Sequence, residues 1–256
     1  MKEKFLSEYS SEDAIRRYTK ETAGDGINYL LENIYGPIYL DAINRLSKRV
    51  DISNGVRLLE FGCGAGMNLI FLVNFLTNNN INVNVAYGTD FSEKLIDAAR
   101  EEARKFLEQT QADKVRFCVA SNENLIEELS SCIGSDQTAI SNSFHLVFGI
   151  NTFRYCHRLK KERESARNVF DLLVPGGSCI IIDMNARFPF FRSKIRDRMN
   201  KSADERYLPS LDEYTSAFES AGFEITAKKN FCWIPKRKSR SWASSHGSSS
   251  KKVSNI

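Results

Sequence analysis

The stretch VRLLEFGCGAGMNL, residues 56–69, determines the fold that the sequence predicts. Its hydrophobic start predicts a buried β-strand over residues 56–61, with the acidic residue Glu60 near the end. Three glycines follow at alternate positions: Gly62, Gly64 and Gly66. An apolar helical pattern then begins at Met67. Because glycine lacks a Cβ atom, a ligand can lie against the main chain where such a loop meets a helix N-terminus, and the stretch therefore predicts a ligand-binding loop.

The spacing of these glycines distinguishes between two classes of ligand. A dinucleotide site uses G-x-G-x-x-G, whose third glycine allows close packing beside a pyrophosphate, whereas Met67 takes that position here. Glu60 would repel a pyrophosphate but would attract an ammonium group. S-adenosylmethionine carries an ammonium group and a sulfonium cation. The motif therefore favours this cofactor, and it disfavours the alternative of a nicotinamide-dependent oxidoreductase.

A second motif, NVAYGTDFSEKLIDAAR at residues 84–100, repeats the order strand, acid, helix. Asp90 ends the predicted strand, where a carboxylate can accept hydrogen bonds from both hydroxyls of a ribose. Phe91 would lie against the adenine face. Ser92 is a suitable N-cap for the helix that follows, and an acid at position 90 would also suit helix capping.

In these motifs the chain resembles the class I S-adenosylmethionine-dependent methyltransferases, and most of all the branch called methyltransferase type 11 or type 12. The resemblance rests on the glycine motif, on Asp90 and on VPGGSCIIIDMN at residues 174–185, and it covers about residues 58–231. It implies an α/β fold with a doubly wound, mostly parallel, Rossmann-like sheet of seven strands. It also implies methyl transfer to an acceptor bound above the carboxyl ends of the strands.

The chain divides into three expected regions. Residues 1–50 predict a helical cap, residues 51–235 the methyltransferase domain, and residues 236–256 a disordered tail rich in serine and basic residues. The tail replaces the seventh strand that the resemblance implies, so that strand is in doubt. The segment from Pro235 to Arg240 would suit nuclear import, an anionic surface or simple solubility, and nucleic acid is expected as a partner only through this tail.

The alternation of strands and helices predicts a parallel sheet with right-handed crossovers. The strands are expected at residues 56–61, 83–90, 115–120, 144–150, 178–184 and 223–233. The helices are expected at residues 28–46, 67–76, 92–107, 123–129, 160–173 and 211–221, with a loop at 134–143. Pro37 is expected to break or bend the first of them, Ser210 to cap the last, and Gly222 to end it.

Composition excludes several other classes of protein. The chain has 256 residues, of which 42% are hydrophobic and 27% charged, as in an ordinary globular domain. No apolar run approaches the roughly 20 residues of a membrane span, and the first ten residues do not look like a secretory signal. We therefore expect a cytoplasmic protein with no membrane contact. Six cysteines without a C-x-x-C motif indicate reduced thiols, and three scattered histidines give no reason to expect a metal site.

The candidate cofactor residues follow from these motifs. Glu60 would bind the methionyl ammonium, directly or through water, unless it is only a solvated strand end. The loop of Gly62, Cys63 and Gly64 would pass beneath the ligand, with Asp90 and Phe91 at the nucleoside. The resemblance adds Asn122, in the segment after the third strand, as an acceptor for the adenine amine where relatives often have an acid at position 121. It also places Ile150, after the fourth strand, near the methyl group.

The residues that act on the methyl acceptor are less evident. Methyl transfer from a sulfonium is an in-line displacement that needs no invariant triad, because the cofactor supplies the reactivity. His157 is the candidate base if the acceptor must lose a proton, although an isolated surface histidine is the commoner explanation. The leading hypothesis is a small-molecule methyltransferase. A methyltransferase of protein or RNA, and a catalytically silent domain that binds a partner, are the alternatives.

Overall fold

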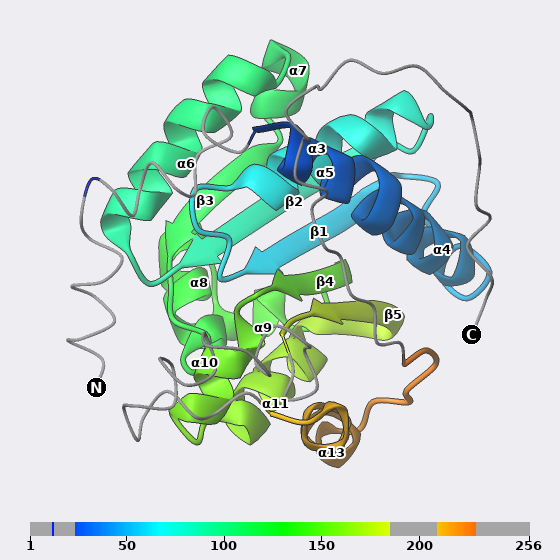
Figure 1. Ribbon diagram of the computed structural model, residues 1–256, viewed down its shortest axis with the longest axis vertical. Coiled ribbons are helices and arrows are strands. Elements are labelled where there is room, and N and C mark those ends of the chain that lie inside the picture. The colour runs from blue at the N-terminus through cyan, green and yellow to red at the C-terminus, as the bar shows by residue number, and fades with distance from the viewer. Residues whose placement is uncertain (1–11, 13–23, 185–208, 229–256) are drawn as a thin grey trace, which may run out of the picture.

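The computed structural model describes residue 12 and residues 24–184 and 209–228 (Figure 1). Its centre is a five-stranded sheet of order β3-β2-β1-β4-β5, in which every neighbouring pair is parallel. The strands are β1 (Val56–Phe61), β2 (Val83–Asp90), β3 (Val115–Val119), β4 (Phe144–Ile150) and β5 (Leu173–Ile182). The predicted bounds of β1, β2 and β4 are confirmed to the residue. The order reverses at β1, so the crevice between β1 and β4 opens at their carboxyl ends.

Helices cover both faces of this sheet, as predicted (Figure 1). One face carries α3 (Gly24–Leu30), the π-helix η2 (Leu31–Tyr35), α4 (Gly36–Leu46), α5 (Met67–Asn78) and α6 (Glu93–Phe106). The opposite face carries α8 (Leu125–Ile133), α10 (Phe153–Arg158), α11 (Glu162–Leu172) and α13 (Leu211–Ala221). Two short helices, α7 (Gln109–Ala112) and α9 (Gln137–Ile140), lie in connections. The observed architecture is a doubly wound α/β fold.

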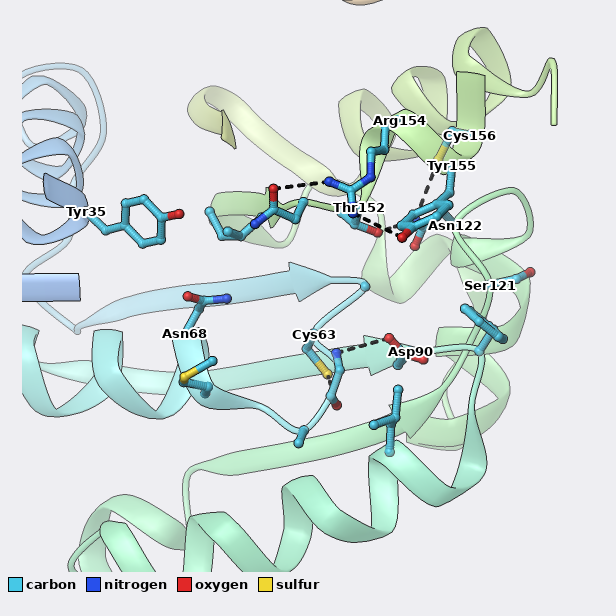
Figure 2. A pocket seen from close by; sticks show the side chains of 18 of the residues that line it. Tyr35, Cys63, Asn68, Asp90, Ser121, Asn122, Thr152, Arg154, Tyr155 and Cys156 are labelled. Atoms are coloured by element: carbon cyan, nitrogen blue, oxygen red, sulfur yellow. Dashed lines mark hydrogen bonds between the residues drawn. The ribbon is translucent and has the colours of Figure 1, made fainter. Parts of the chain in front are cut away.

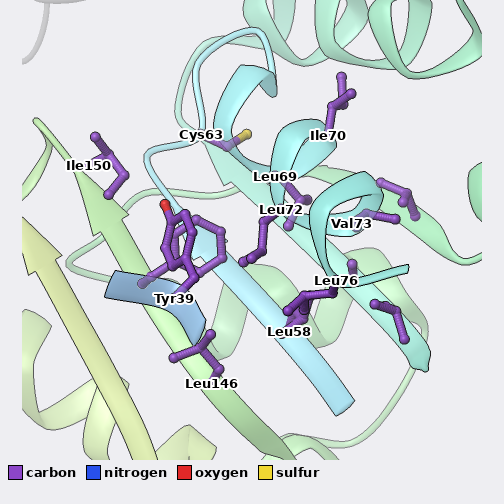
Figure 3. Packing of buried hydrophobic residues seen from close by; sticks show 14 of the residues in the cluster. Tyr39, Leu58, Cys63, Leu69, Ile70, Leu72, Val73, Leu76, Leu146 and Ile150 are labelled. Carbon is purple, nitrogen blue, oxygen red and sulfur yellow. The ribbon is translucent and has the colours of Figure 1, made fainter. Parts of the chain in front are cut away.

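The two faces are built by the alternation of side chains along each strand. In β1, Val56 and Leu58 pack into the cluster formed with α4, α5 and α6, which Figure 3 shows in part. Leu59 and Phe61 pack into the second cluster, with α8, α10, α11 and α13. Since successive side chains point to opposite faces, Glu60 lies on the side of α4 and α5.

Helix ends follow the predicted capping residues. Ser210 Oγ accepts from the backbone N–H of Glu213, and the Glu213 carboxylate accepts from the backbone N–H of Ser210, which is a complete capping box. Gly222 ends the same helix with a φ of 108°. Ser92 Oγ accepts from the Leu95 N–H at the start of α6. These short-range signals need no tertiary context, so the sequence predicts them well.

Pro37 was expected to break or bend the N-terminal helix. It does not break it. Proline lacks the N–H that an α-helix needs at this position, and the chain passes through the π-helix η2 just before it. The Gly36 N–H donates to the Leu31 carbonyl, five residues earlier. Pro37 then lies in the first turn of α4, and the helical chain continues through it without a break.

Three further element predictions need correction. Strand β5 starts at Leu173 rather than at residue 178, because Leu173 already pairs with Phe144 before a register shift. The predicted loop 134–143 contains the short helix α9, which Asp136 caps by accepting from the Thr138 N–H. Residues 223–228 form no strand, although they begin the predicted sixth strand. The rest of that segment, the doubtful seventh strand and the tail lie outside the described residues.

The cysteine prediction also needs correction. Cys118 in β3 and Cys132 in α8 form a disulfide, with their Cα atoms 5.9 Å apart. The two residues are 14 positions apart and meet only because α8 packs against β3. Sequence spacing alone therefore gave no sign of the pair. Of the other cysteines that the structure describes, Cys63, Cys156 and Cys179 are free thiols.

In the described part of the chain, no helix combines the length and the apolar character that crossing a bilayer requires.

Candidate functional site

A cavity of about 290 Å³ opens at the carboxyl ends of β1, β2 and β4 (Figure 2). It is bounded by the loop after β1, the loop after β3, α10 and the N-terminal helices α3 and η2. The predicted cofactor residues that line it are Gly62, Cys63, Gly64, Asp90, Phe91, Asn122 and Ile150. Residues from four separate βα connections thus meet at one cavity. Glu60 is the member of the predicted set that does not line it.

Asp90 connects two walls of this cavity. Its Oδ2 accepts from the Gly64 N–H at 3.0 Å, and its Oδ1 accepts from the Ser92 N–H at 2.9 Å. Burial raises the pKa of Asp90 to about 6, against the opposing effect of hydrogen bonds from Ser92, Gly64 and Phe91. A carboxylate oxygen can accept more than one hydrogen bond. Asp90 can therefore hold the glycine loop and still accept hydrogen bonds from a ligand in the cavity.

The glycines of the loop serve the protein's own packing as well as ligand access. Gly62 has a φ of 64°, and a Cβ atom at this position would overlap the Thr152 side chain. Gly66, with a φ of 77°, is the N-cap of α5, and a Cβ there would come within 2.8 Å of the Phe117 ring. A side chain at either glycine would therefore both strain the backbone and push apart packed elements.

Glu60 lies beneath the cavity floor. It is completely buried, on the side of α4 and α5, and burial raises its pKa well above the usual value. Its Oε1 accepts from Asn68 Nδ2 at 3.1 Å, and Asn68 lines the cavity. Glu60 therefore reaches the cavity through Asn68. Sequence reasoning missed Asn68, whose position on the first turn of the helix after the glycines was the available signal.

The loop after β3 forms the wall opposite α5. Asn122 Nδ2 donates to Thr152 Oγ1 at 3.0 Å and lies 3.5 Å from Cys156 Sγ. The side-chain oxygen of Asn122 is then the atom left to accept from a ligand, as predicted for an adenine amine. Ser121 also lines the cavity, and its backbone N–H donates to the Glu128 carboxylate of α8. Asn122 is thus held by α10 and its N-cap residue Thr152, and Ser121 by α8.

Helix α10 adds aromatic and charged groups to the cavity wall. Arg154 Nη1 lies 3.2 Å from Asp183 Oδ1, and its guanidinium stacks 4.8 Å above the Tyr155 ring (Figure 2). The Arg154 side chain is only 16% exposed, so this is a partly buried pair rather than a surface one. From the helical side, the Tyr35 hydroxyl points toward these groups. Burial, with a contribution from Asp183, raises the pKa of Tyr35 to about 12, so its phenol stays protonated.

The two histidines that the structure describes do not line the cavity. His157, in α10, has its Nδ1 3.8 Å from Glu162 Oε1 and a side chain that is 13% exposed. His145 Nδ1 accepts from the Arg57 N–H at 2.9 Å, which makes it a residue that joins β4 to β1. His157 as the base stays a prediction that this geometry does not favour, since the histidine does not face the cavity.

The fold and the cavity define a nucleotide-type cofactor site at the switch point of a doubly wound sheet. The family model of the methyltransferase domain matches residues 52–231, which is more than half of the chain. The chain therefore belongs to this family. It is a class I S-adenosylmethionine-dependent methyltransferase, as the sequence motifs predicted.

Solved structures with the same fold include two that align over most of the chain. The C-methyltransferase domain of the citrinin polyketide synthase is 18% identical, with a TM-score of 0.57 over 85% of this chain. The chain spans only 52% of that domain. A candidate methyltransferase from Bacillus halodurans C-125 is 15% identical, with a TM-score of 0.51, and the match covers 73% of this chain and 71% of the other. At such identities the likeness shows the fold alone. No curated protein matches the sequence significantly.

Proposed function

We propose that the cavity binds S-adenosylmethionine and that the chain transfers its methyl group to a small molecule. The observation that supports this most is the meeting of the glycine loop, Asp90 and Asn122, from three different strands, on one cavity. In this proposal Asp90 accepts from the ribose hydroxyls and Asn122 from the adenine amine. Phe91 covers the adenine, and the loop at Gly62, Cys63 and Gly64 runs beneath the methionine.

The residues present fit this cofactor. The buried Asp90 carboxylate faces neutral hydroxyl donors better than it would face a pyrophosphate. At the methionine end, Asn68 and Ile150 border the cavity, with Glu60 behind Asn68. When bound, the cofactor supplies an electrophilic methyl group. The chain's own residues would hold the acceptor in line with that methyl and exclude water.

The acceptor end supports a small and largely neutral molecule. Leu31 gives it an apolar wall and Tyr35 an aromatic one, while Tyr155 and Leu159 pack in the same cluster as Phe91. The charge of Arg154 is paired with Asp183, so this end offers little attraction to a polyanion such as RNA.

We infer a cytoplasmic site of action, where the cofactor is available. The division into a cap over 1–50, a domain over 51–235 and a tail over 236–256 belongs to the same proposal.

Replacement of Asp90 tests the cofactor site. Asp90→Ala removes charge-assisted hydrogen bonds worth roughly 1.5–3 kcal/mol each, so the affinity for S-adenosylhomocysteine should fall by about tenfold or more. Titration calorimetry on the purified protein measures this directly. Asp97→Ala is the matched control, because Asp97 is an exposed acid on α6 that pairs with Arg100 and does not line the cavity. Equal affinities in the wild type and Asp90→Ala would refute the assignment of Asp90.

The acceptor class is tested with labelled methyl groups. The protein and labelled S-adenosylmethionine are added to a cell extract that has been separated by size into small molecules and macromolecules. Label should appear in the small-molecule fraction and depend on Asp90. Label found only in protein or RNA would contradict a small-molecule acceptor while leaving the methyltransferase activity intact.

A further inference from the structure

The disulfide between Cys118 and Cys132 joins the strand that leads to the cavity with a helix behind it. Cys118 lies in β3, is 2% exposed and precedes the cavity loop by two residues. Cys132, near the end of α8, is exposed. One sulfur of the bond is therefore held in the core beside the proposed cofactor site, while the other belongs to a residue that solvent reaches.

Helix α8 also holds the cavity loop by a hydrogen bond. The Glu128 carboxylate accepts from the backbone N–H of Ser121, and it accepts from Asn124 Nδ2 at 3.3 Å. Glu128 and Cys132 are four residues apart, so they lie on the same face of α8. The disulfide thus fixes the helix face from which Glu128 holds Ser121. Ser121 and the adjacent Asn122 both line the cavity.

The free thiols of the described residues are poor competitors in thiol exchange. Cys63 and Cys156 are buried, and burial raises the pKa of Cys63 well above its usual value and that of Cys156 to about 12. Cys179 also has a raised pKa because of burial. Since the thiolate is the reactive form, exchange in this part of the chain is directed to the disulfide, through Cys132.

We propose that Cys118 and Cys132 form a redox-responsive site whose reaction partner is a dithiol reductant, and that the disulfide strengthens cofactor binding through α8. This rests on the proposed cofactor site. A thiolate of the dithiol attacks the Cys132 sulfur and forms a mixed disulfide, while the Cys118 sulfur leaves and takes up a proton. The second thiol of the reductant then closes its own disulfide and releases Cys132 as a thiol. The protein gains two electrons, and the reductant loses them.

The test compares the oxidised and reduced forms of the full chain. Dithiothreitol is the probe, and alkylation followed by mass spectrometry establishes whether Cys118 and Cys132 are free. Reduction should weaken the binding of S-adenosylhomocysteine by about fivefold, the scale of one hydrogen bond. Cys132→Ser should bind like the reduced wild type, and dithiothreitol should not change its affinity.

A second variant tests the route through α8. Glu128→Ala removes the acceptor for the Ser121 N–H, so it should bind weakly in both redox states, with little further loss on reduction. Equal affinities of oxidised and reduced wild type would overturn the proposal, as would two free thiols in the air-oxidised protein or a response of Cys132→Ser to dithiothreitol. Absence of binding in every redox state would instead contradict the proposed cofactor site.

Discussion

At the scale of single residues, the site depends on carboxyl groups in unlike surroundings. Asp90 faces the cavity and is held by backbone N–H groups, whereas Glu60 is sealed between the sheet and two helices. Both have a raised pKa because burial disfavours the charged form. Of the two, Asp90 is the one that lines the cavity. The sequence places both acids at strand ends, but Glu60 pairs with Gly88, two residues before Asp90, so on the same face of the sheet it lies deeper beneath the cavity.

The raised pKa of Asp90 predicts a pH dependence of cofactor binding. Its folded-state pKa is about 6, against 3.8 as the usual value. Its stabilising effect on the fold is therefore complete below about 3.8 and is lost as pH rises through about 6. Ribose hydroxyls bind better to the ionised carboxylate, so the affinity for S-adenosylhomocysteine should rise by about tenfold as pH increases through this range.

Calorimetric titration below and above pH 6 measures this change. Asp90→Asn is the control, because the amide keeps the shape of the side chain and does not titrate. The variant should bind weakly and lose the part of the pH dependence that belongs to Asp90. An identical pH profile in wild type and variant would assign the titration to another group, of which the buried Glu60 is the nearest.

At the scale of elements, the π-helix η2 determines which side chains the N-terminal helices give to the cavity. Leu31 and Tyr35 are both buried and both line it. A π-helical turn inserts one residue into the helical repeat, and such turns are frequent at functional sites. Pro37 favours this turn by removing an N–H from the α-helical ladder. The sequence identified the proline, but it did not indicate a π-helix.

Removal of the Tyr35 hydroxyl tests this contribution. Tyr35→Phe keeps the buried ring and removes the hydroxyl, which in the proposed complex makes a neutral hydrogen bond worth about 1 kcal/mol to the methyl acceptor. The acceptor KM should rise about fivefold, with little change in the affinity for S-adenosylhomocysteine. Tyr29→Phe is the matched control, since Tyr29 is 52% exposed on α3. A loss confined to cofactor affinity would place Tyr35 at the cofactor instead of the acceptor.

The limits of sequence reasoning follow from the range of the interactions involved. Strands such as β1 and β4, and the capped helix α13, are determined by local pattern, and their predicted positions are confirmed. The early start of β5 depends on pairing with Phe144, which is set by the neighbouring strand. The contacts of Glu60 with Asn68 and of Cys118 with Cys132 likewise arise only when helices pack on the sheet.

At the scale of the whole molecule, the cavity couples distant parts of the chain. Its walls come from η2, the loop after β1, the end of β2, the loop after β3, and β4 with α10. A ligand that touches all of these contacts elements from both helical layers (Figure 1). An unfolded chain cannot gather these groups, so the ligand binds the native state almost exclusively. Cofactor binding should therefore stabilise the fold as a unit.

Thermal unfolding measures this coupling. At about a hundredfold excess over its Kd, S-adenosylhomocysteine adds about 2.7 kcal/mol of stability. For a chain of this size that corresponds to a rise in Tm of about 5–10 °C. The shift should grow with ligand concentration and be much smaller for Asp90→Ala, whose affinity is reduced.

NADH is the control ligand and should leave the Tm unchanged. Met67 stands where a dinucleotide site has the last glycine of G-x-G-x-x-G, and the acids around the loop are buried, so both features disfavour a pyrophosphate. A shift with NADH and none with S-adenosylhomocysteine would mean that the cavity accepts a dinucleotide.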